Sequence, residues 1–452
     1  MHIAMTRPLF AWESLEDSPS LGTIQQLLAS IPDAQLLEGL RAYRDRGRND
    51  YPVHVLWGVV LLRIILRHVS WEATLGELRR NVGLHALIGI GSEPEVPKAW
   101  NVSRFLEVLG REPHRRDLRE MFDRMARRLS QGVPDLGQNT AGDSTALHAR
   151  PKGDAKAAAA ETAEGLPQPT AGRKEYTDEE GKVTKIVEWF GYKRHLLVDA
   201  RHEVSLAYQT TAANTSDGQT LPALVQQAQV NVPEGRMKTL AYDKAADDGE
   251  IHRELAAAGI RPVIENRRLW KDDPERLLPG HDGTTNVVYD EAGTLYCYDR
   301  TRETPVKHPM SYIGYEPQRG TIKYRCPARH EGWSCPSATI CNAGKEYGKT
   351  VRVDCQVDLR RFPPIPRATK KFERLYRGRT SVERVNARLK IFWGVDDGNI
   401  TGARRFHGMV GAVMVVHLAF ATALAAAPRR EGTLGKLHLG PIQAALRQTC
   451  SS

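Results

Sequence analysis

Three β-rich runs follow one another closely in this sequence: KVTKIVEWF (182–190), YKRHLLVDA (192–200) and VSLAYQTTA (204–212). Turns are predicted between them, at Gly191 and at the bend Arg201-His202-Glu203. Farther along the chain, TLPALVQQAQV and GEIHRELAAAG have the apolar spacing of helices, and TLAYD and RPVIEN have that of short strands. Consecutive strands followed by alternating helices and strands predict an α/β fold with a mixed sheet flanked by helices.

Three acidic residues lie where such a sheet would bring them together. Asp143 lies in a predicted first strand, Asp243 directly follows the apolar run TLAY, and Glu383 lies in a late helix. Three carboxylates on a sheet and a neighbouring helix can hold two Mg²⁺ ions, which prefer oxygen ligands and can promote phosphodiester cleavage. Other acids also lie near predicted ends of helices or strands: Asp199, Asp217, Asp247 and Asp248. Because a lone Asp there is usually a cap or turn residue, the sequence positions alone leave the choice of acids open.

Glu383 lies in a strongly basic stretch, YRGRTSVERVNARLK, residues 376–390. On a helix, spacings of four and seven place Tyr376, Arg379, Glu383 and Lys390 on nearly one face. The surrounding segment 360–394 contains eleven Lys and Arg residues and two acids, a net charge of +9, in a chain with a formal net charge of +10. Such a block indicates a phosphate-rich ligand, although an ion-paired helix facing solvent has a similar pattern.

These motifs resemble those of bacterial insertion-sequence transposases of the DDE class, whose catalytic domain is RNase H-like. The signature Tyr-x2-Arg-x3-Glu-x6-Lys of one large group of these enzymes is matched at Tyr376, Arg379, Glu383 and Lys390.

Two further motifs and the N-terminal region extend this resemblance. Asp143-Ser144-Thr145 resembles the first-aspartate motif, and Asp243-Lys244 resembles the second, in which Ala245 and Ala246 replace the usual Gly-Tyr. The segment WGVVLLRIILRHVSWEATLGELRRNVGL resembles the helical domain common in these proteins. The resemblance therefore covers most of the chain.

The resemblance implies a catalytic triad that binds two Mg²⁺ ions, or Mn²⁺ in their place, formed by Asp143, Asp243 and Glu383. It also implies contacts to DNA by Tyr376, Arg379, Arg384 and Lys390. Such an enzyme binds double-stranded DNA at the terminal inverted repeats, cleaves it, and joins the new 3′-OH to target DNA, with a homodimer expected in the synaptic complex. For Tyr376, simple packing is the alternative to DNA contact.

Two other functions compete with transposition. One is an RNase H-like nuclease without strand transfer, and the other is a catalytically inactive DNA-binding repressor. The presence of all three acids argues against the repressor, since an inactive derivative has no physical reason to retain them.

The predicted organisation has an all-helical DNA-binding domain at 1–135, a catalytic domain at 136–427 and a tail at 428–452. A low-complexity stretch predicts a flexible insertion at 151–175, and a polar segment with most of the cysteines predicts a second insertion at 267–359, before the last catalytic helix.

The N-terminal region shows short amphipathic helices, with Ser70 as a predicted N-cap. Two of them end in Arg79-Arg80 and Arg127-Arg128. This pattern suits a helix-turn-helix-like DNA-binding unit, and it suits an ordinary helical bundle equally well.

The second insertion contains four residues with a loose metal-ligand spacing: Cys326, His330, Cys335 and Cys341. Cys297 and Cys355 flank them. Zinc is one interpretation, but the spacing is not that of a paired Cys-x2-Cys ribbon, so ordinary thiols are favoured.

Cysteine usage and the N-terminal residues predict a cytoplasmic, nucleoid-associated protein, since no secretory signal is recognisable. The apolar segment Gly408–Ala427 is about long enough to span a bilayer. Its Ala and Gly content and His417 favour a buried helix, and no membrane association is expected.

Overall fold

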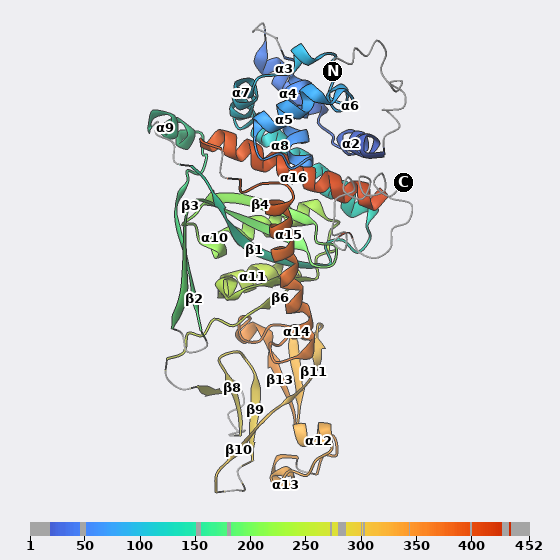
Figure 1. Ribbon diagram of the computed structural model, residues 1–452. Coiled ribbons are helices and arrows are strands. Elements are labelled where there is room, and N and C mark those ends of the chain that lie inside the picture. Colours follow the sequence, from blue (N-terminus) through green and yellow to red (C-terminus); the bar gives the residue numbers. More distant parts are fainter. Residues whose placement is uncertain are drawn as a thin grey trace, which may run out of the picture.

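A computed structural model describes residues 19–45, 51–150, 155–178, 182–271, 274–278, 286–299, 301, 303–342, 344–397, 400–426 and 434. Helices lie at one end of the molecule, a mixed sheet lies in the middle, and a β-rich insertion lies at the other end (Figure 1).

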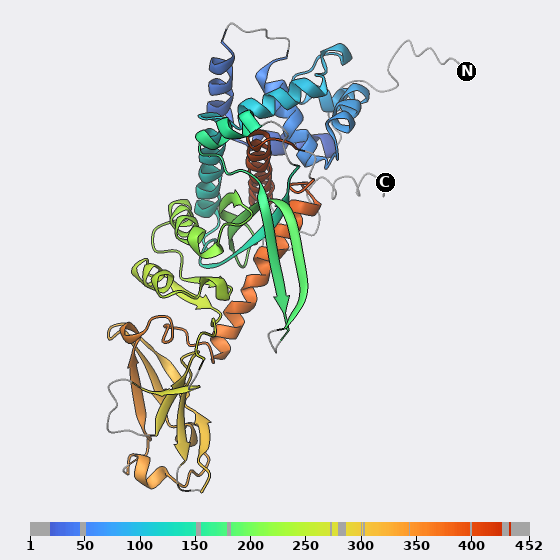
Figure 2. The ribbon, with the colours of Figure 1, turned by 90° about the vertical axis from the view of Figure 1, so that its left-hand side faces the viewer.

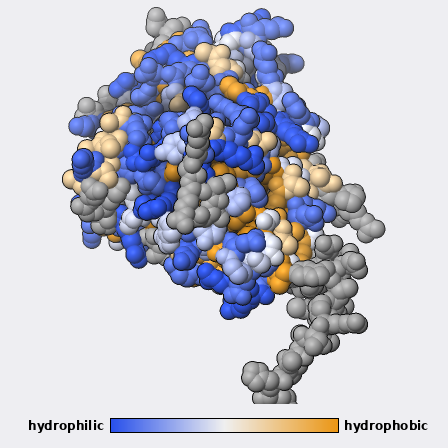
Figure 3. Space-filling view, turned by 90° about the horizontal axis from the view of Figure 1, so that it is seen from above, coloured by the Kyte–Doolittle hydropathy of each residue, from blue (hydrophilic) through white to orange (hydrophobic). Residues whose placement is uncertain are grey.

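The N-terminal region is helical, as predicted. Its elements are α2 (Pro19–Ala29), α3 (Ala34–Arg44), α4 (Val53–Ile65), α5 (Trp71–Arg80), α6 (Val82–Ala86), the 3₁₀ turn η1 (Glu93–Glu95), α7 (Ala99–Leu109) and α8 (His114–Gly132). The predicted cap is confirmed, because Ser70 Oγ accepts a hydrogen bond from the Ala73 amide at 3.1 Å. Seen from this end, the surface is mostly hydrophilic, with an apolar stretch along one side (Figure 3).

The central sheet has the topology expected of an RNase H-like fold. Its strands are β1 (Asn139–His148), β2 (Thr170–Thr177), β3 (Val183–Asp199), β4 (Ser205–Ala212), β5 (Thr239–Tyr242) and β6 (Arg261–Ile264). β3 lies between β4 and β1 and is antiparallel to both, whereas β1, β5 and β6 are parallel. The helices that connect these strands are α10 (Asp217–Asn231), the 3₁₀ turn η2 (Lys244–Ala246) and α11 (Gly249–Ala257). The predicted mixed sheet flanked by helices is therefore confirmed.

The predicted turn at Gly191 is wrong, because β3 continues through this residue. The inner half of β3 pairs with β1, and its outer half pairs with β2 to form a long hairpin that projects from the sheet (Figure 2). A Cβ atom at Gly191 would lie 2.1 Å from the carbonyl oxygen of Leu147, and φ is +153°. Glycine here lets the strand pass the end of β1, instead of ending it.

The stretch 151–175, for which a flexible insertion was predicted, is described from residue 155 and contains a helix and the start of a strand, joined by a turn and an irregular segment at 164–169. α9 occupies Ala155–Ala163, and β2 begins at Thr170. The β2 sequence TAGRKEYT is polar and does not alternate, so its strand character comes from its pairing with β3.

The insertion 267–359 forms two small antiparallel sheets. Their strands are β7 (Glu275–Leu277), β8 (Val287–Asp290), β9 (Leu295–Asp299), β10 (Val306–Pro309), β11 (Ser311–Glu316), β12 (Thr321–Arg325) and β13 (Thr350–Asp354). Two short helices, α12 (Pro327–Glu331) and α13 (Ala338–Asn342), lie between β12 and β13, and the 3₁₀ turn η3 (Cys355–Val357) follows. The insertion has a hydrophobic cluster separate from that of the rest of the chain.

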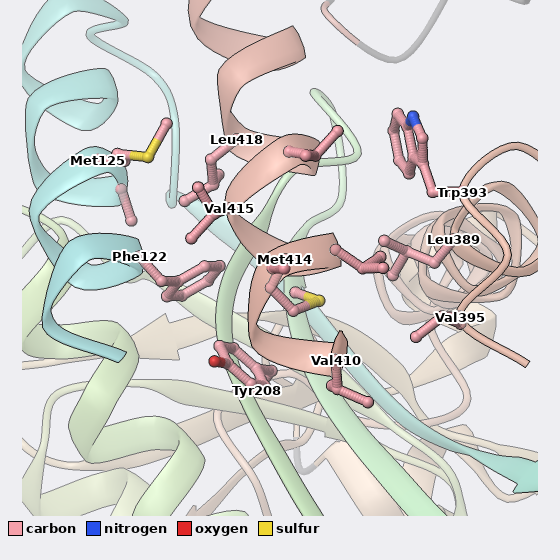
Figure 4. Packing of buried hydrophobic residues seen from close by; sticks show 14 of the residues in the cluster. Phe122, Met125, Tyr208, Leu389, Trp393, Val395, Val410, Met414, Val415 and Leu418 are labelled. Atoms are coloured by element: carbon pink, nitrogen blue, oxygen red, sulfur yellow. The ribbon is translucent and has the colours of Figure 1, made fainter. Parts of the chain in front are cut away.

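The last described elements return to the main body: α14 (Lys370–Tyr376), the 3₁₀ turn η4 (Arg377–Arg379), α15 (Thr380–Ile391) and α16 (Ala403–Ala426). α16 packs between the N-terminal helices and the sheet (Figures 1 and 4). Side chains around it are Phe122, Met125, Tyr208, Leu389 and Trp393. One hydrophobic core therefore joins the helical layer to the sheet.

By length and composition, α16 could cross a membrane, but 72% of its most apolar window is buried inside the protein. The prediction of a buried helix is thus confirmed for this segment. Of the predicted tail 428–452, only Leu434 lies within the described residues.

Candidate active site

Asp143 lies in the middle of β1, on the strand that runs through the centre of the sheet. The preceding Gly142 leaves room for the ring of Tyr242, which a Cβ atom there would approach within 2.5 Å. The Asp143 side chain is only 13% exposed and accepts a hydrogen bond from the Ser144 amide at 2.8 Å. Burial is the main cause that raises the pKa of Asp143 to about 6, and the charge of Asp243 contributes to this rise.

Asp243 follows β5, the parallel neighbour of β1. Its carboxylate accepts a hydrogen bond from the Ala245 amide at 3.0 Å and so caps η2. Burial raises the pKa of Asp243 too. The second-aspartate motif therefore starts a short turn at the carboxyl end of β5, beside Asp143.

Glu383 projects from α15, which packs on the sheet through buried Val382, Val385 and Leu389. The Glu383 side chain is 50% exposed, on the side of the helix away from those apolar residues. This exposure leaves its carboxylate accessible to a large ligand.

Arg379 joins two of these carboxylates directly. Its Nη1 donates to Asp143 Oδ2 at 3.3 Å, and its Nη2 donates to Glu383 Oε1 at 2.8 Å. Burial lowers the pKa of Arg379, but the neighbouring anions, led by Asp143 and including Asp243, raise it overall. The structure thus brings Asp143, Asp243 and Glu383 together around one guanidinium group.

The basic stretch 376–390 is not the single helix on which its face was predicted. η4 separates α14 from α15, so Tyr376 and Glu383 belong to different helical segments. The Tyr376 hydroxyl donates to Glu265 Oε2 at 3.0 Å, and its ring stacks on Phe372 at 5.6 Å. Burial raises the pKa of Tyr376. These contacts therefore support the alternative that Tyr376 packs against protein groups.

Two of the predicted DNA-binding cations also contact protein groups. Arg384 Nε donates to Glu203 Oε1 at 2.5 Å, although its side chain is 53% exposed. Lys390 Nζ donates to the Ala146 carbonyl at 2.6 Å and pairs with Asp396 at 3.1 Å. Lys390 thereby ties α15 to β1, the strand that carries Asp143.

Two residues near the triad were not predicted as site residues. Asp217, the first residue of α10, accepts hydrogen bonds from Ser144 Oγ at 2.9 Å and Lys193 Nζ at 3.1 Å. Its charge raises the pKa of Asp243, after the larger effect of burial. Lys174 lies in β2, and its charge lowers the pKa of both Asp143 and Asp243. The β2–β3 hairpin therefore brings a cation toward the site.

The remaining acids near predicted element ends have structural partners. Asp199 accepts a hydrogen bond from the Gly137 amide at 2.7 Å. Asp248 caps α11 by accepting a hydrogen bond from the Glu250 amide at 2.8 Å. Asp247 is buried and forms ion pairs with Arg360 and Arg367. The contacts of Asp199 and Asp248 agree with the predicted turn and cap roles, whereas Asp247 is a buried ion-pair residue.

The predicted zinc ligands are only partly brought together. Cys326, Cys335 and Cys341 line one cavity in the insertion, and Cys297 lines it too. His330 is exposed on α12 and is not among the residues lining this cavity.

The donor chemistry of the triad fits a divalent cation with a preference for oxygen. Two partly buried carboxylates with raised pKa values and a third, more exposed one offer oxygen ligands, and a bound cation would offset the repulsion between Asp143 and Asp243. Within the described residues, no three His, Cys, Asp or Glu side chains already stand at metal-ligand spacing. Arg379, between Asp143 and Glu383, supplies the positive charge in this arrangement.

In a comparison with protein families, the model of the family described as "Transposase DDE domain" matches residues 140–419. No curated protein matches the sequence. The matched span begins in β1, before Asp143, and ends in α16, beyond Glu383.

Proposed function

This chain belongs to the transposase DDE domain family, and from that membership we propose that it cleaves DNA at the ends of an insertion sequence and joins the resulting 3′-OH to target DNA. Membership indicates a nucleic-acid-cleaving enzyme with DNA as its substrate. The finer statements concern the site residues, the metal ions, recognition of the ends and strand transfer.

The observation that best supports this proposal is the bridge formed by Arg379. It links Asp143 on the central strand to Glu383 on α15, beside Asp243. These residues come from distant parts of the chain, and no packing requirement explains three acids at one place. In the proposed function, Asp143, Asp243 and Glu383 hold the metal ions.

Two Mg²⁺ or Mn²⁺ ions, when bound, would activate the attacking oxygen and stabilise the leaving oxygen of the phosphodiester. The protein's own contribution is to fix the carboxylates. The backbone amides of Ser144 and Ala245 donate hydrogen bonds to the carboxylates of Asp143 and Asp243, respectively. These bonds hold both side chains in place. Arg379 would release the carboxylates and bind the negatively charged DNA backbone.

The proposed DNA-binding surface includes Arg379, Arg384 and Lys390, with Tyr376 at its edge. The predicted basic block does not face DNA as a whole, because Arg360 is almost fully buried against Asp247.

The neighbouring helix α14 extends this surface toward the insertion. Lys370, Lys371, Arg374 and Arg377, on α14 and in η4, are exposed. These cations would contact phosphates without reading sequence.

Recognition of the ends is assigned to the N-terminal helices. The side chains of Arg79, Arg80, Arg127 and Arg128 are all exposed. Contacts to base edges require an element in a groove, and a helix in the major groove is the commonest arrangement. A homodimer in the synaptic complex and a cytoplasmic, nucleoid-associated location are part of the same proposal.

The decisive experiment uses purified full-length protein, Mg²⁺ and labelled terminal-repeat DNA, with cleavage and joined products resolved on a gel. Joined product supports transposition. Cleavage without joining would identify a nuclease, and DNA binding without cleavage would identify a repressor.

A matched pair of variants tests whether Glu383 acts in this reaction. Glu383→Gln should abolish cleavage, since it removes charge and preserves side-chain volume. Glu373→Gln is the control, because Glu373 is an exposed acid in α14 that pairs with Arg377. Similar cleavage by both variants would remove Glu383 from the triad.

A further inference from the structure

A small cavity in the insertion is lined by four cysteines that the proposed DNA chemistry does not use. The residues are Cys297, Cys326, Cys335 and Cys341, and the cavity has a volume of about 20 Å³. That volume accommodates about one water-sized occupant. Four thiols around a space of this size are the ligands that a structural zinc ion takes.

The four thiols come from separate segments of the chain. Cys297 lies in β9, Cys326 directly precedes α12, Cys335 lies in the loop before α13, and Cys341 lies in α13. α12 and α13 lie at the far end of the insertion (Figure 1). A common ligand would therefore join this end of the insertion to the sheet containing β9.

The electrostatics show that the thiols are close enough to influence one another. Burial is the main cause that raises the pKa of Cys297 to about 12, and the charges of Cys326, Cys335 and Cys341 contribute to this rise. The pKa of Cys335 is also raised, mainly by burial, with contributions from the charges of Cys326 and Cys341. A divalent cation would reverse this effect, because it favours the thiolate form of its ligands.

The segment 326–342 has little apolar packing of its own. α12 and α13 contain five residues each, and no residue of this segment belongs to the hydrophobic cluster of the insertion. Among its contacts are the rings of His308 and Trp333, 4.8 Å apart, and a hydrogen bond of 2.7 Å from Ser337 to Asp299. So small a folded segment generally needs a cross-link.

We propose that Cys297, Cys326, Cys335 and Cys341 bind one zinc ion in a closed, structural four-thiolate site. In this ligand set Cys297 replaces His330, which was predicted as a ligand but is exposed and outside the cavity. Because the described side chains do not yet stand at metal-ligand spacing, zinc binding turns the thiols toward the centre of the cavity. Four protein ligands leave no open position, so the site would stabilise structure and not perform catalysis.

The test measures zinc bound to full-length protein, purified under reducing conditions, reconstituted with zinc and freed of excess metal. Mass spectrometry of the metal should give about one zinc ion per chain. Ser substitution at any of the four cysteines should remove most of it. Cys355→Ser and His330→Ala are the matched controls and should keep it, because Cys355 lies in the hydrophobic cluster and His330 is exposed.

A second measurement does not depend on the folding of any variant. Wild-type protein reconstituted with Co²⁺ should show the visible absorption of tetrahedral cobalt and strong thiolate charge-transfer bands. A wild-type protein that binds no zinc would overturn the proposal. Finding these cysteines as disulfides in protein purified under reducing conditions would overturn it too. Loss of zinc in His330→Ala with retention in Cys297→Ser would overturn the ligand set.

Discussion

Replacing Asp143 with asparagine should inactivate the protein and also stabilise it when no metal is present. The carboxyl is mostly buried, and burial raises its pKa from 3.8 to about 6. A shift of roughly 2 units corresponds to about 3 kcal/mol between the two protonation states. Because asparagine resembles the neutral carboxyl, Asp143→Asn should raise the free energy of unfolding by about 3 kcal/mol at pH 8.

The gain in stability from Asp143→Asn should be larger at high pH than at low pH. The folded protein retains the Asp143 proton up to about pH 6, whereas the unfolded chain releases it near pH 3.8. The stability that protonation provides is therefore complete below pH 3.8 and is lost as pH rises through about 6. The difference between variant and wild type should fall to about half of its pH 8 value at pH 5.

Urea unfolding in a chelator, followed by tryptophan fluorescence, measures this difference. Asp248→Asn is the control, since Asp248 is an exposed N-cap and asparagine caps helices equally well. Its effect should stay within about 0.5 kcal/mol at both pH values. An Asp143→Asn variant no more stable than wild type at pH 8, or a gain that grows toward pH 5, would refute the reasoning. Mg²⁺ should then stabilise wild type but not Asp143→Asn.

Three other outcomes are expected. Asp243→Asn should abolish cleavage and leave binding to terminal DNA largely intact, so more than a few per cent of residual cleavage would remove Asp243 from the triad. Arg379→Ala and Lys390→Ala should weaken binding to terminal and unrelated DNA alike and reduce the salt dependence by about one unit of slope per lost phosphate contact; an unchanged slope in both would mean that they face protein only. Replacing Arg79 and Arg80 with Ala in the full-length chain should lower the preference for terminal-repeat over scrambled DNA in a gel-shift assay, and an unchanged preference would move recognition elsewhere.

The sheet and the position of its acids could be predicted because local signals agreed with the tertiary structure. β-rich runs formed β3 and β4, and the TLAY run formed β5 with Asp243 at its end. The motif around Glu383 added a specific spacing that composition does not supply. The positions of these three acids in the fold could thus be predicted, whereas Asp217 looked like an ordinary helix start.

The parts that were missed depend on pairing between distant segments. β2 has no strand pattern of its own, and Gly191 has the usual appearance of a turn residue. The break at η4 separates Tyr376 from α15 in a sequence whose spacing suits one continuous helix. In each case a tertiary contact decides the local structure, and single-sequence periodicity does not register it.

The position of α16 bears on how the protein is made. The N-terminal helices are synthesised first, yet the helix that packs between them and the sheet spans Ala403–Ala426. During translation, the apolar surfaces of both layers therefore stay uncovered until α16 is synthesised. This happens only after all residues of the site have been synthesised. A ribosome that stops before Ala403 releases a chain with all three acids but with two uncovered apolar faces. Such products should aggregate or be degraded, so only chains completed through α16 would become active.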